Sequence, residues 1–298
     1  EHRVLGVLKR DGPNVHIEPV DRKSRYGFIV DASEVKEIPD GELVAVEPLS
    51  GRRSGLPRAK ISERLGSLNE PKTVSLIAIH AHGIPVAFSS ETIVEAESAK
   101  PLNSKGRTDL RETPLITIDP EDARDHDDAV WAGPDPDKSN PGGHIVIVAI
   151  ADVAHYVRPG SMLDREAYTR GNSVYFPDRV VPMLPEALST DLCSLREGED
   201  RAALAVRMHF DAQGVKRHHK FERVFMRSAA RLSYADAQSA FDGKPNARTK
   251  PIATKIMAPL WAAYMAVAKA RDKRGPLDLD LPERRVILDE KGNVSSIA

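Results

Sequence analysis

The sequence is poor in cysteine and in long apolar runs. Its single cysteine, Cys193, excludes an internal disulfide and a cysteine-rich zinc site, and such sparing use of cysteine is typical of a reducing compartment. The longest purely apolar run, residues 145–151, is far shorter than the roughly 20 residues that a membrane-spanning helix needs. No signal-peptide pattern opens the sequence. We therefore expect a cytoplasmic protein that does not contact a membrane.

The sequence also lacks an excess of charge of either sign. Its 43 lysines and arginines nearly balance its 44 aspartates and glutamates, which gives a formal net charge of −1. Because the overall charge does not attract a polyanion, nucleic-acid binding would have to arise from local patches. The length of 298 residues and the hydrophobic share of 41% predict a globular protein with room for two domains.

What the sequence does contain is a dense acidic stretch. Six carboxylates fall within the ten residues 119–128, and only Arg124 opposes them. The mostly apolar runs 115–118 and 129–131 flank this stretch, so we expect a turn between two buried strands. Carboxylates this close repel one another strongly once they are partly desolvated, so the turn must bind cations or raise the pKa of some members. Oxygen-only ligands favour Mg²⁺, with Mn²⁺ as the alternative.

Other interpretations of this stretch compete with a magnesium site. An EF-hand calcium loop fails, because the fifth position counted from Asp119 is Ala123 and no glycine stands at the sixth position counted from Asp125. A structural, solvated acidic turn remains an alternative that spacing alone does not decide against. His126 lies among hard oxygen ligands, so we expect it behind the ligands or facing solvent rather than on the metal.

The first hundred residues predict a small β-barrel of the OB or cold-shock type. Short strands with turn residues between them are expected at residues 4–8, 15–17, 26–30 and 43–46. The segment RYGFIV at 25–30 resembles the aromatic strand of cold-shock domains, on which Tyr26 and Phe28 would stack bases. An ordinary strand with two core aromatics is the alternative.

The barrel is followed by a basic cluster and a covering segment. Glycine and proline residues predict a loop for the cluster, which would grip phosphates or be simply solvated, and its members are Arg52, Arg53, Arg58, Lys60 and Arg64. Residues 74–79 predict one more strand. Proline, glycine and small polar residues at 99–106 predict a domain boundary.

Beyond this boundary the pattern is that of a mixed sheet with helices. Residues 145–151 predict a strand covered on both faces of its sheet, and residues 204–226 predict an antiparallel hairpin. Helices are expected at 163–169, capped by Ser161, at 234–241, capped by Ser233, and at 251–274. The stripe of the last helix that we expect in the core is Ile256, Leu260, Tyr264 and Val267.

The acidic stretch also carries a family signature. The spacing Asp119-x5-Asp125-x-Asp127-Asp128 resembles the catalytic signature of the ribonuclease II / ribonuclease R family, within that family's RNB domain. Other motifs of the family occur in the same order, namely GRTDLR at 106–111, VAIADV at 148–153, RP at 158–159, LDREA at 163–167, SVYFP at 173–177, PMLP at 182–185 and LCSL at 192–195. The resemblance is strong over residues 106–288 and looser before them, and it is closest to the ribonuclease R branch.

The resemblance implies an α+β fold, in which an OB/cold-shock-like β-barrel precedes the N-terminal part of an RNB catalytic domain. The expected domains are 1–98 for RNA binding, 99–106 as a linker and 107–298 for catalysis. The implied activity is that of a Mg²⁺-dependent 3′-to-5′ exoribonuclease that hydrolyses RNA processively to 5′-mononucleotides. We expect a monomer that takes the single-stranded 3′ end of RNA.

The resemblance also assigns residues to this activity. Asp119, Asp125, Asp127 and Asp128 are implied as the catalytic ligands of Mg²⁺ or Mn²⁺. Tyr175 is implied to pack on a terminal nucleotide, and a core ring at a strand end is its alternative. The Arg-rich segment and C-terminal OB domain of the family do not occur here, so we expect a fragment that binds RNA weakly and degrades it poorly.

Two rival functions remain. A non-catalytic RNA-binding module would be favoured by a substituted acid cluster, yet all four aspartates are present. A Mg²⁺-dependent phosphatase or DNase would use the same acids but gives no role to the OB-like domain.

Overall fold

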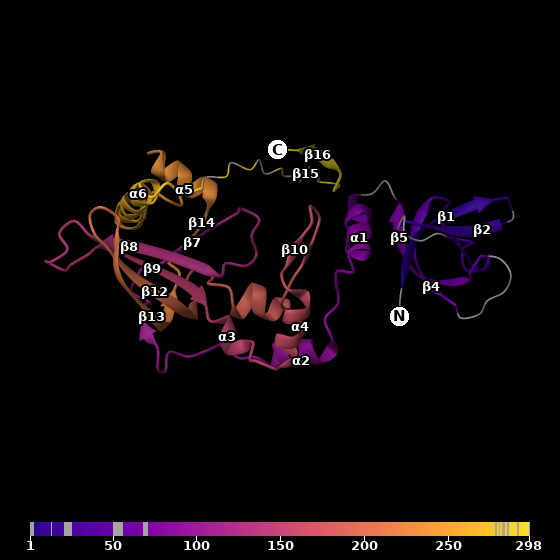
Figure 1. Cartoon of the computed structure of the whole chain (residues 1–298), viewed down its shortest axis with the longest axis horizontal. Helices are drawn as coiled ribbons and strands as arrows, with labels where there is room; N and C mark the ends of the chain where they lie inside the picture. Colours follow the sequence, from indigo (N-terminus) through magenta and orange to yellow (C-terminus); the bar gives the residue numbers. More distant parts are fainter. Residues whose placement is uncertain are drawn as a thin grey trace. The chain divides into compact units, whose positions relative to one another are not determined.

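The computed structural model describes residues 3–12, 14–20, 26–49, 56–67, 71–277, 279, 281, 284, 286–290 and 292–297. The chain forms two compact units (Figure 1), of which the first comprises Glu1–Ala87, Arg170–Met183 and Leu281–Ala298, and the second Phe88–Thr169 and Leu184–Asp280. The chain therefore passes between the units several times. The boundary expected at residues 99–106 stays a prediction. Within the described stretches, no helix is long and apolar enough to cross a membrane.

The first unit contains a five-stranded antiparallel sheet in the order β3-β2-β1-β4-β5. Its strands are β1 (Val4–Asp11), β2 (Asn14–Pro19), β3 (Phe28–Ile29), β4 (Glu42–Pro48) and β5 (Ala59–Ser67). Alternate residues of neighbouring strands fill one core, among them the fully buried Leu8, Ile17 and Val44. The amide of Ile29 donates to the carbonyl of Pro57 at 2.9 Å, which joins β3 to the segment leading into β5. The cold-shock or OB-like sheet is thereby confirmed.

The loop predicted for the basic cluster was wrong in its second half. Residues from Ala59 onward pair with β4 as β5, and Lys60 and Arg64 therefore lie on a strand. Arg64 forms a bidentate ion pair with the carboxylate of Glu42, at 2.8 and 3.0 Å. The glycine and proline signals precede the strand rather than fill it. Arg52 and Arg53 lie outside the described residues.

The strand predicted at 74–79 was also wrong, because residues 71–81 form the helix α1 (Pro71–Ala81). Val74, Ile77 and Ile79 are β-branched and favour a strand. Proline is favoured at the first helical position, where its missing N–H costs nothing, and the helix begins at residue 71. Ile79 is buried while Val74 is exposed, so one side of the helix is covered and helical packing overrides the local preference.

The remaining parts of the first unit are short antiparallel ribbons, β10 (Val174–Tyr175) with β11 (Val180–Val181) and β15 (Val286–Leu288) with β16 (Val294–Ile297). Side chains tie the β10–β11 ribbon to the preceding segments of the same unit. Ser75 of α1 donates to the carboxylate of Asp178. The guanidinium of Arg170 donates to the carbonyls of Pro85 and Ala87, at 2.6 and 2.7 Å.

The second unit is built on a seven-stranded mixed sheet in the order β14-β7-β8-β9-β12-β13-β6. Its strands are β6 (Thr108–Asp109), β7 (Ile116–Asp119), β8 (Asp128–Pro134), β9 (His144–Ala151), β12 (Asp200–Phe210), β13 (Lys216–Arg227) and β14 (Ala230–Ser233). The strands from β7 to β13 pair antiparallel, and the two edge strands pair parallel with β7 and β13. The mixed α+β architecture and the hairpin predicted at 204–226 are confirmed.

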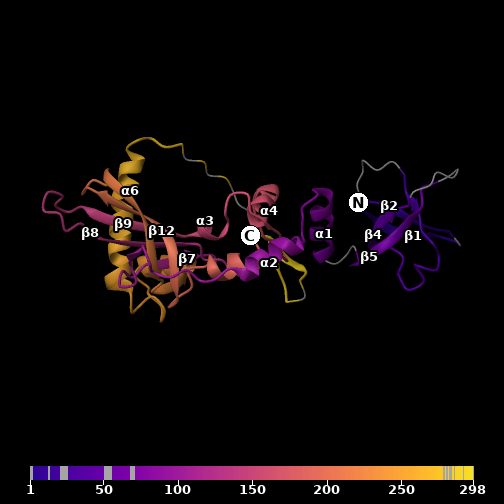
Figure 2. The ribbon, with the colours of Figure 1, turned by 90° about the horizontal axis from the view of Figure 1, so that it is seen from below.

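Helices and π-helical turns complete this unit, namely α2 (Ser90–Ser98), α3 (Val153–Tyr156), α4 (Met162–Arg170), η1 (Ala187–Leu192), α5 (Tyr234–Phe241), η2 (Ala253–Met257) and α6 (Ala258–Asp272). One sheet face packs on a core that includes Ile147, Leu163 and Leu188. On the other face, residues of α5 and η2 pack over β7 and β14, and α6 lies across β8 and β9 (Figure 2). Both sheet faces are therefore at least partly covered.

The predicted helix caps are confirmed, and two finer predictions for this unit are not. The hydroxyls of Ser161 and Ser233 accept from backbone amides at the starts of α4 and α5. The strand at 145–151 is present, but Ile150 is 41% exposed, because the helices cover only part of the second face. Tyr264 is exposed rather than in the core, since η2 interrupts the α-helical period that placed it on the buried stripe.

Candidate functional site

The acidic stretch forms the connection between two adjacent antiparallel strands, as predicted. Asp119 is the last residue of β7 and Asp128 is the first residue of β8. Asp128 lies opposite Ile150 near the end of β9, and the carbonyl of Asp127 accepts a hydrogen bond from the amide of Ala151 at 2.8 Å. The sheet register therefore fixes where the two ends of the acidic turn lie.

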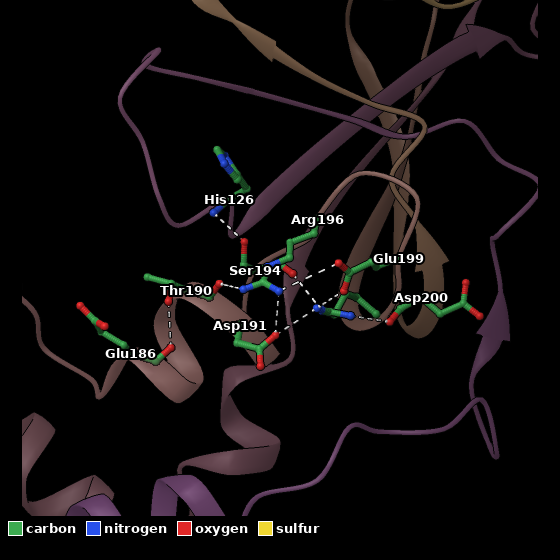
Figure 3. A network of polar contacts seen from close by, with 9 residues as sticks. His126, Glu186, Thr190, Asp191, Ser194, Arg196, Glu199 and Asp200 are labelled. Atoms are coloured by element: carbon green, nitrogen blue, oxygen red, sulfur yellow. Dashed lines mark hydrogen bonds and ion pairs between the residues drawn. The ribbon is translucent and has the colours of Figure 1, made fainter.

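A second segment holds the turn from another side. The amide of His126 donates to the hydroxyl of Ser194 at 3.3 Å, and the carbonyl of His126 accepts from the amide of Leu195 at 2.6 Å. This segment is itself cross-linked, because Arg196 donates to the carbonyl of Thr190 and forms an ion pair with Asp191 at 3.2 Å (Figure 3). The backbone of the acidic turn is therefore anchored by main-chain contacts.

Three of the predicted site carboxylates lie close enough to repel one another. Burial raises the pKa of Asp128, and the negative charges of Asp127 and then Asp119 raise it further. Asp119 is buried, Asp125 and Asp128 are partly buried, and the side chain of Asp127 is exposed. Within the described stretches, no lysine or arginine side chain forms an ion pair with any of the four aspartates. The lysines and arginines of the described residues therefore leave the charge of the cluster unpaired.

A buried histidine contacts the cluster. Nδ1 of His126 lies 2.8 Å from Oδ2 of Asp119, and both side chains are nearly inaccessible to solvent. The sequence placed His126 behind the ligands or facing solvent, and the structure places it in the interior against Asp119. The sequence spacing of Asp119 and His126 does not predict their contact. The turn between them has neither a helical nor a strand period that would place the two side chains on one face.

The cluster fits a hard divalent cation in donor chemistry and in charge. Carboxylate oxygens are the ligands that Mg²⁺ and Mn²⁺ prefer, and an uncompensated, partly desolvated group of carboxylates gains most from a cation. Among the described residues, no three His, Cys, Asp or Glu side chains are already gathered into a closed cage. A bound ion would thus have to draw the aspartates together.

A neighbouring carboxylate, at the end of β9 next to the start of β8, has a different environment. Asp152 follows β9 and is buried, and its carboxylate receives a hydrogen bond from the buried guanidinium of Arg107. Cys193 lies near both kinds of acid, and burial, then the charges of Asp152 and Asp127, raise the pKa of its thiol to about 12. Cys193 is therefore a core residue without nucleophilic character.

The predicted nucleotide-binding aromatics belong to the first unit and differ from one another. Tyr26, just before β3, is 66% exposed, and Tyr175 on β10 is exposed to the same degree. Phe28 is 7% exposed and packs in the barrel core with Ile17 and Val30. The structure therefore gives Phe28 the alternative role of a core aromatic, because its side of β3 points into the barrel. Tyr26 and Tyr175 are exposed rather than core rings, and their roles on nucleotides stay predictions.

Sequence reasoning missed a charged cavity beside the acidic turn. The cavity has a volume of about 680 Å³ and is lined by the three carboxylates Glu121, Asp122 and Glu197 and by four arginines, namely Arg124, Arg196, Arg231 and Arg248. Arg231 donates to the carbonyl of Ala123 at 3.3 Å, and Arg248 pairs with Glu197 at 2.8 Å. Within the described residues Arg124 forms no hydrogen bond or ion pair. No local signal predicts this grouping, because it joins residues from distant parts of the chain.

Comparisons with known proteins agree with this arrangement. A family model described as a cold shock domain matches residues 16–89, and one described as an RNB domain matches residues 107–298. Ribonuclease R of Vibrio parahaemolyticus is 40% identical over 289 residues, which are 95% of this chain and 34% of that protein. The chain spans between 34% and 63% of the length of the first curated relatives that it matches.

Solved structures show the same fold. The structure of Mycoplasma genitalium RNase R in complex with double-stranded RNA matches with a TM-score of 0.86 at 24% identity, over 100% of this chain and 53% of that one. The structure of yeast Ssd1, a pseudonuclease, matches with a TM-score of 0.65 at 16% identity, over 95% of this chain and 35% of that one. Since the RNB domain model covers well over half of the chain, and the acidic turn, the mixed sheet and the preceding cold-shock domain stand in the expected order, the chain belongs to the RNB family of ribonuclease II and ribonuclease R.

Proposed function

We propose that the protein is a Mg²⁺-dependent 3′-to-5′ exoribonuclease of the ribonuclease R type, which hydrolyses RNA processively to 5′-mononucleotides, with Mn²⁺ as the alternative metal. The observation that carries this proposal is the group Asp119, Asp127 and Asp128, whose charges repel and which no lysine or arginine among the described side chains pairs with. Membership of the RNB family supports the same conclusion. A stably folded turn with such a charge is better explained by a cation site than by a purely structural role.

In this proposal the four aspartates hold the metal ions and orient them. Divalent ions, when bound, supply a water of lowered pKa and neutralise charge that builds up on the scissile phosphate. Asp119 and Asp128 sit at strand ends, so their backbone positions are fixed before metal or RNA arrives. Asp127 is exposed and lies next to Asp128, which suits a ligand that faces the substrate side. The short side chains match the narrow octahedral requirement of Mg²⁺.

The RNA partner is expected to enter by its single-stranded 3′ end. Tyr175 would pack on a terminal nucleotide and Tyr26 on a base further along, since a ring face binds any base without reading its edge. The arginine-lined cavity would favour phosphate groups near the acidic turn, with Arg124 as the side chain that has no protein partner among the described residues. A monomer in the cytoplasm completes the proposal, and the single, buried cysteine supports that compartment.

The proposal is tested with one oligoribonucleotide labelled at either end. A processive 3′-to-5′ exonuclease releases label from the 3′ end as mononucleotide at once, whereas label at the 5′ end stays on long RNA and then on a short remnant. A chelator should stop both, and Mg²⁺ should restore them. Early release of the 5′ label as mononucleotide would contradict the 3′-to-5′ direction. A series of internal fragments would contradict the exonuclease assignment. A DNA oligonucleotide of the same sequence tests the rival DNase assignment.

The second candidate is an RNA-binding module without catalysis. Yeast Ssd1, which shares the fold, is a pseudonuclease, so the fold alone does not establish hydrolysis. The chain also spans only part of its relatives. RNA binding that persists while neither end of the labelled RNA is ever shortened, with Mg²⁺ present, would favour this candidate.

A further inference from the structure

We propose that His126 is a positioning residue for Asp119: it holds one carboxylate oxygen of Asp119 through Nδ1 and leaves the other oxygen directed to a cation. This inference rests on the proposed metal site. It concerns a side chain that touches neither RNA nor, in this arrangement, the metal itself. The spacing of the four aspartates alone does not predict this role of His126.

The contact between the two side chains is short and buried. Nδ1 of His126 and Oδ2 of Asp119 are 2.8 Å apart, and the side chains of His126 and Asp119 are 5% and 12% exposed. An ionised carboxylate can only accept, so Nδ1 carries the hydrogen and donates it. A buried carboxylate with a single strong hydrogen bond keeps one orientation, because turning it would leave a buried donor unpaired.

The histidine is itself held on both sides of its backbone. Its amide donates to Ser194 (Figure 3), and its carbonyl accepts from Leu195. Arg196 and Arg201 cross-link the segment that supplies both partners. Ser194 and Leu195 are almost completely buried. The backbone of His126 is therefore held in place, so the fold determines where its ring contacts Asp119.

The restraint falls on the carboxylate that is most deeply buried in the acidic turn. Asp119 is 8% exposed, whereas Asp127 is exposed and Asp125 is partly buried. Among the described residues the four aspartates do not form a closed cage, so a metal has to recruit them. A carboxylate that is already oriented lowers the entropy lost in that recruitment. Hydrogen-bond partners that orient metal ligands typically change metal affinity by about 10–100-fold when they are removed.

Two substitutions separate positioning from packing. His126→Phe keeps a flat ring in the interior but removes the donor, and His126→Asn keeps an N–H donor at nearly the place of Nδ1 while removing the ring. His144→Phe makes the same chemical change at the opposite end of β9 and serves as the matched control. The measurements are the affinity of the chain for Mn²⁺ and for Mg²⁺ by titration calorimetry, and the melting temperature in a chelator.

We expect His126→Phe to weaken Mn²⁺ binding by roughly 10–100-fold, His126→Asn to stay within about threefold of the unchanged chain, and His144→Phe to change nothing. Equal Mn²⁺ affinity of His126→Phe and the unchanged chain overturns the inference and leaves the proposed function standing. An affinity lost equally in both His126 variants, in step with the melting temperature, also overturns it, because packing then explains the loss. Absence of metal uptake by the unchanged chain overturns the proposed function together with the inference.

Discussion

Two carboxylates at the adjacent ends of the central strands β8 and β9 have opposite environments. Asp152 follows β9, is buried, and is neutralised by the buried guanidinium of Arg107. Asp128 begins the neighbouring strand β8, is partly buried, and has two further aspartates beside it in place of a cation. Burial and repulsion raise the pKa of Asp128, whereas the guanidinium of Arg107 donates a hydrogen bond to the carboxylate of Asp152.

The difference between the two environments suggests that Asp152 stabilises the fold, whereas Asp128 belongs to the proposed metal site. A buried ion pair with additional hydrogen bonds joins segments that are distant in sequence, here the start of the RNB region and the end of β9. The guanidinium of Arg107 also reaches the carbonyls of Ala203 and Val224, at 3.5 Å each. Carboxylates that repel one another without a lysine or arginine partner disfavour folding, which supports the proposed cation site.

The largest expected effect is on chemistry at the unpaired side. Asp127→Asn keeps size and shape but removes a charge, so in an RNA-cleaving preparation hydrolysis should fall roughly a thousandfold or more, since neutralisation at the transition state is local. RNA affinity should stay within about tenfold, because it is spread over many phosphate and stacking contacts. Single-turnover cleavage and filter binding on the same preparation measure both. Cleavage near the original rate would remove Asp127 from the catalytic ligands, and a joint fall of binding and cleavage would contradict the separation.

The next effect is on folding at the paired side. Arg107→Met leaves the carboxylate of Asp152 buried and unpaired, so the free energy of unfolding should fall by about 3 kcal/mol. The same substitution at Arg111, whose ion pair with Asp109 is exposed to solvent and screened by it, should lower the free energy of unfolding far less. Urea denaturation in a chelator measures both variants. Equal stability of Arg107→Met and Arg111→Met would show that Asp152 does not depend on its partner.

The smallest expected effect is an increase in the free energy of unfolding, opposite in sign to that of Arg107→Met, and it distinguishes the two carboxylates most sharply. Asp128→Asn removes a repelled charge, so without metal it should stabilise the chain by roughly 0.5–1 kcal/mol, a modest amount because solvent screens this half-exposed group. The pKa of Asp128 is raised in the fold, so its ionised form disfavours folding at neutral pH and the cost disappears as the pH falls to the ordinary range of aspartate.

The advantage of the Asn variant should therefore shrink on acidification. Asp152→Asn, which weakens a buried ion pair, should instead destabilise the chain at pH 7. Paired denaturation curves at pH 7 and near pH 4 provide the measurement. If Asp128→Asn lost stability at pH 7 as Asp152→Asn does, the two carboxylates would be of one kind and the comparison would fail.

Local signals in the sequence predicted much of the fold. The hydroxyls of Ser161 and Ser233 cap their helices, the alternating strands of the hairpin pair in register, and the acidic turn lies between two strands, because each depends on a few adjacent residues. Residues 71–81 were predicted as a strand because β-branched residues dominate there, and packing of one helical side decided otherwise.

The contacts that shape the site were less predictable. The pairing of Asp152 with Arg107 and the approach of Arg231 to the acidic turn join residues far apart in sequence, and they follow from sheet order rather than from spacing. Phe28 and Tyr26 are two residues apart, yet one is in the core and the other is exposed. Strand alternation would place both side chains on the same face, and they differ because β3 begins only at Phe28 and Tyr26 lies before it.

The central claim is that the acidic turn is a divalent metal site, and calorimetric titration of the chain with Mg²⁺ and Mn²⁺ tests it most directly. The comparison is between the unchanged chain and a variant in which Asp119, Asp125, Asp127 and Asp128 are all Asn, with melting temperature as the folding control. We predict metal uptake by the unchanged chain and none by a variant that is still folded. Uptake of equal strength and stoichiometry in both would contradict the account.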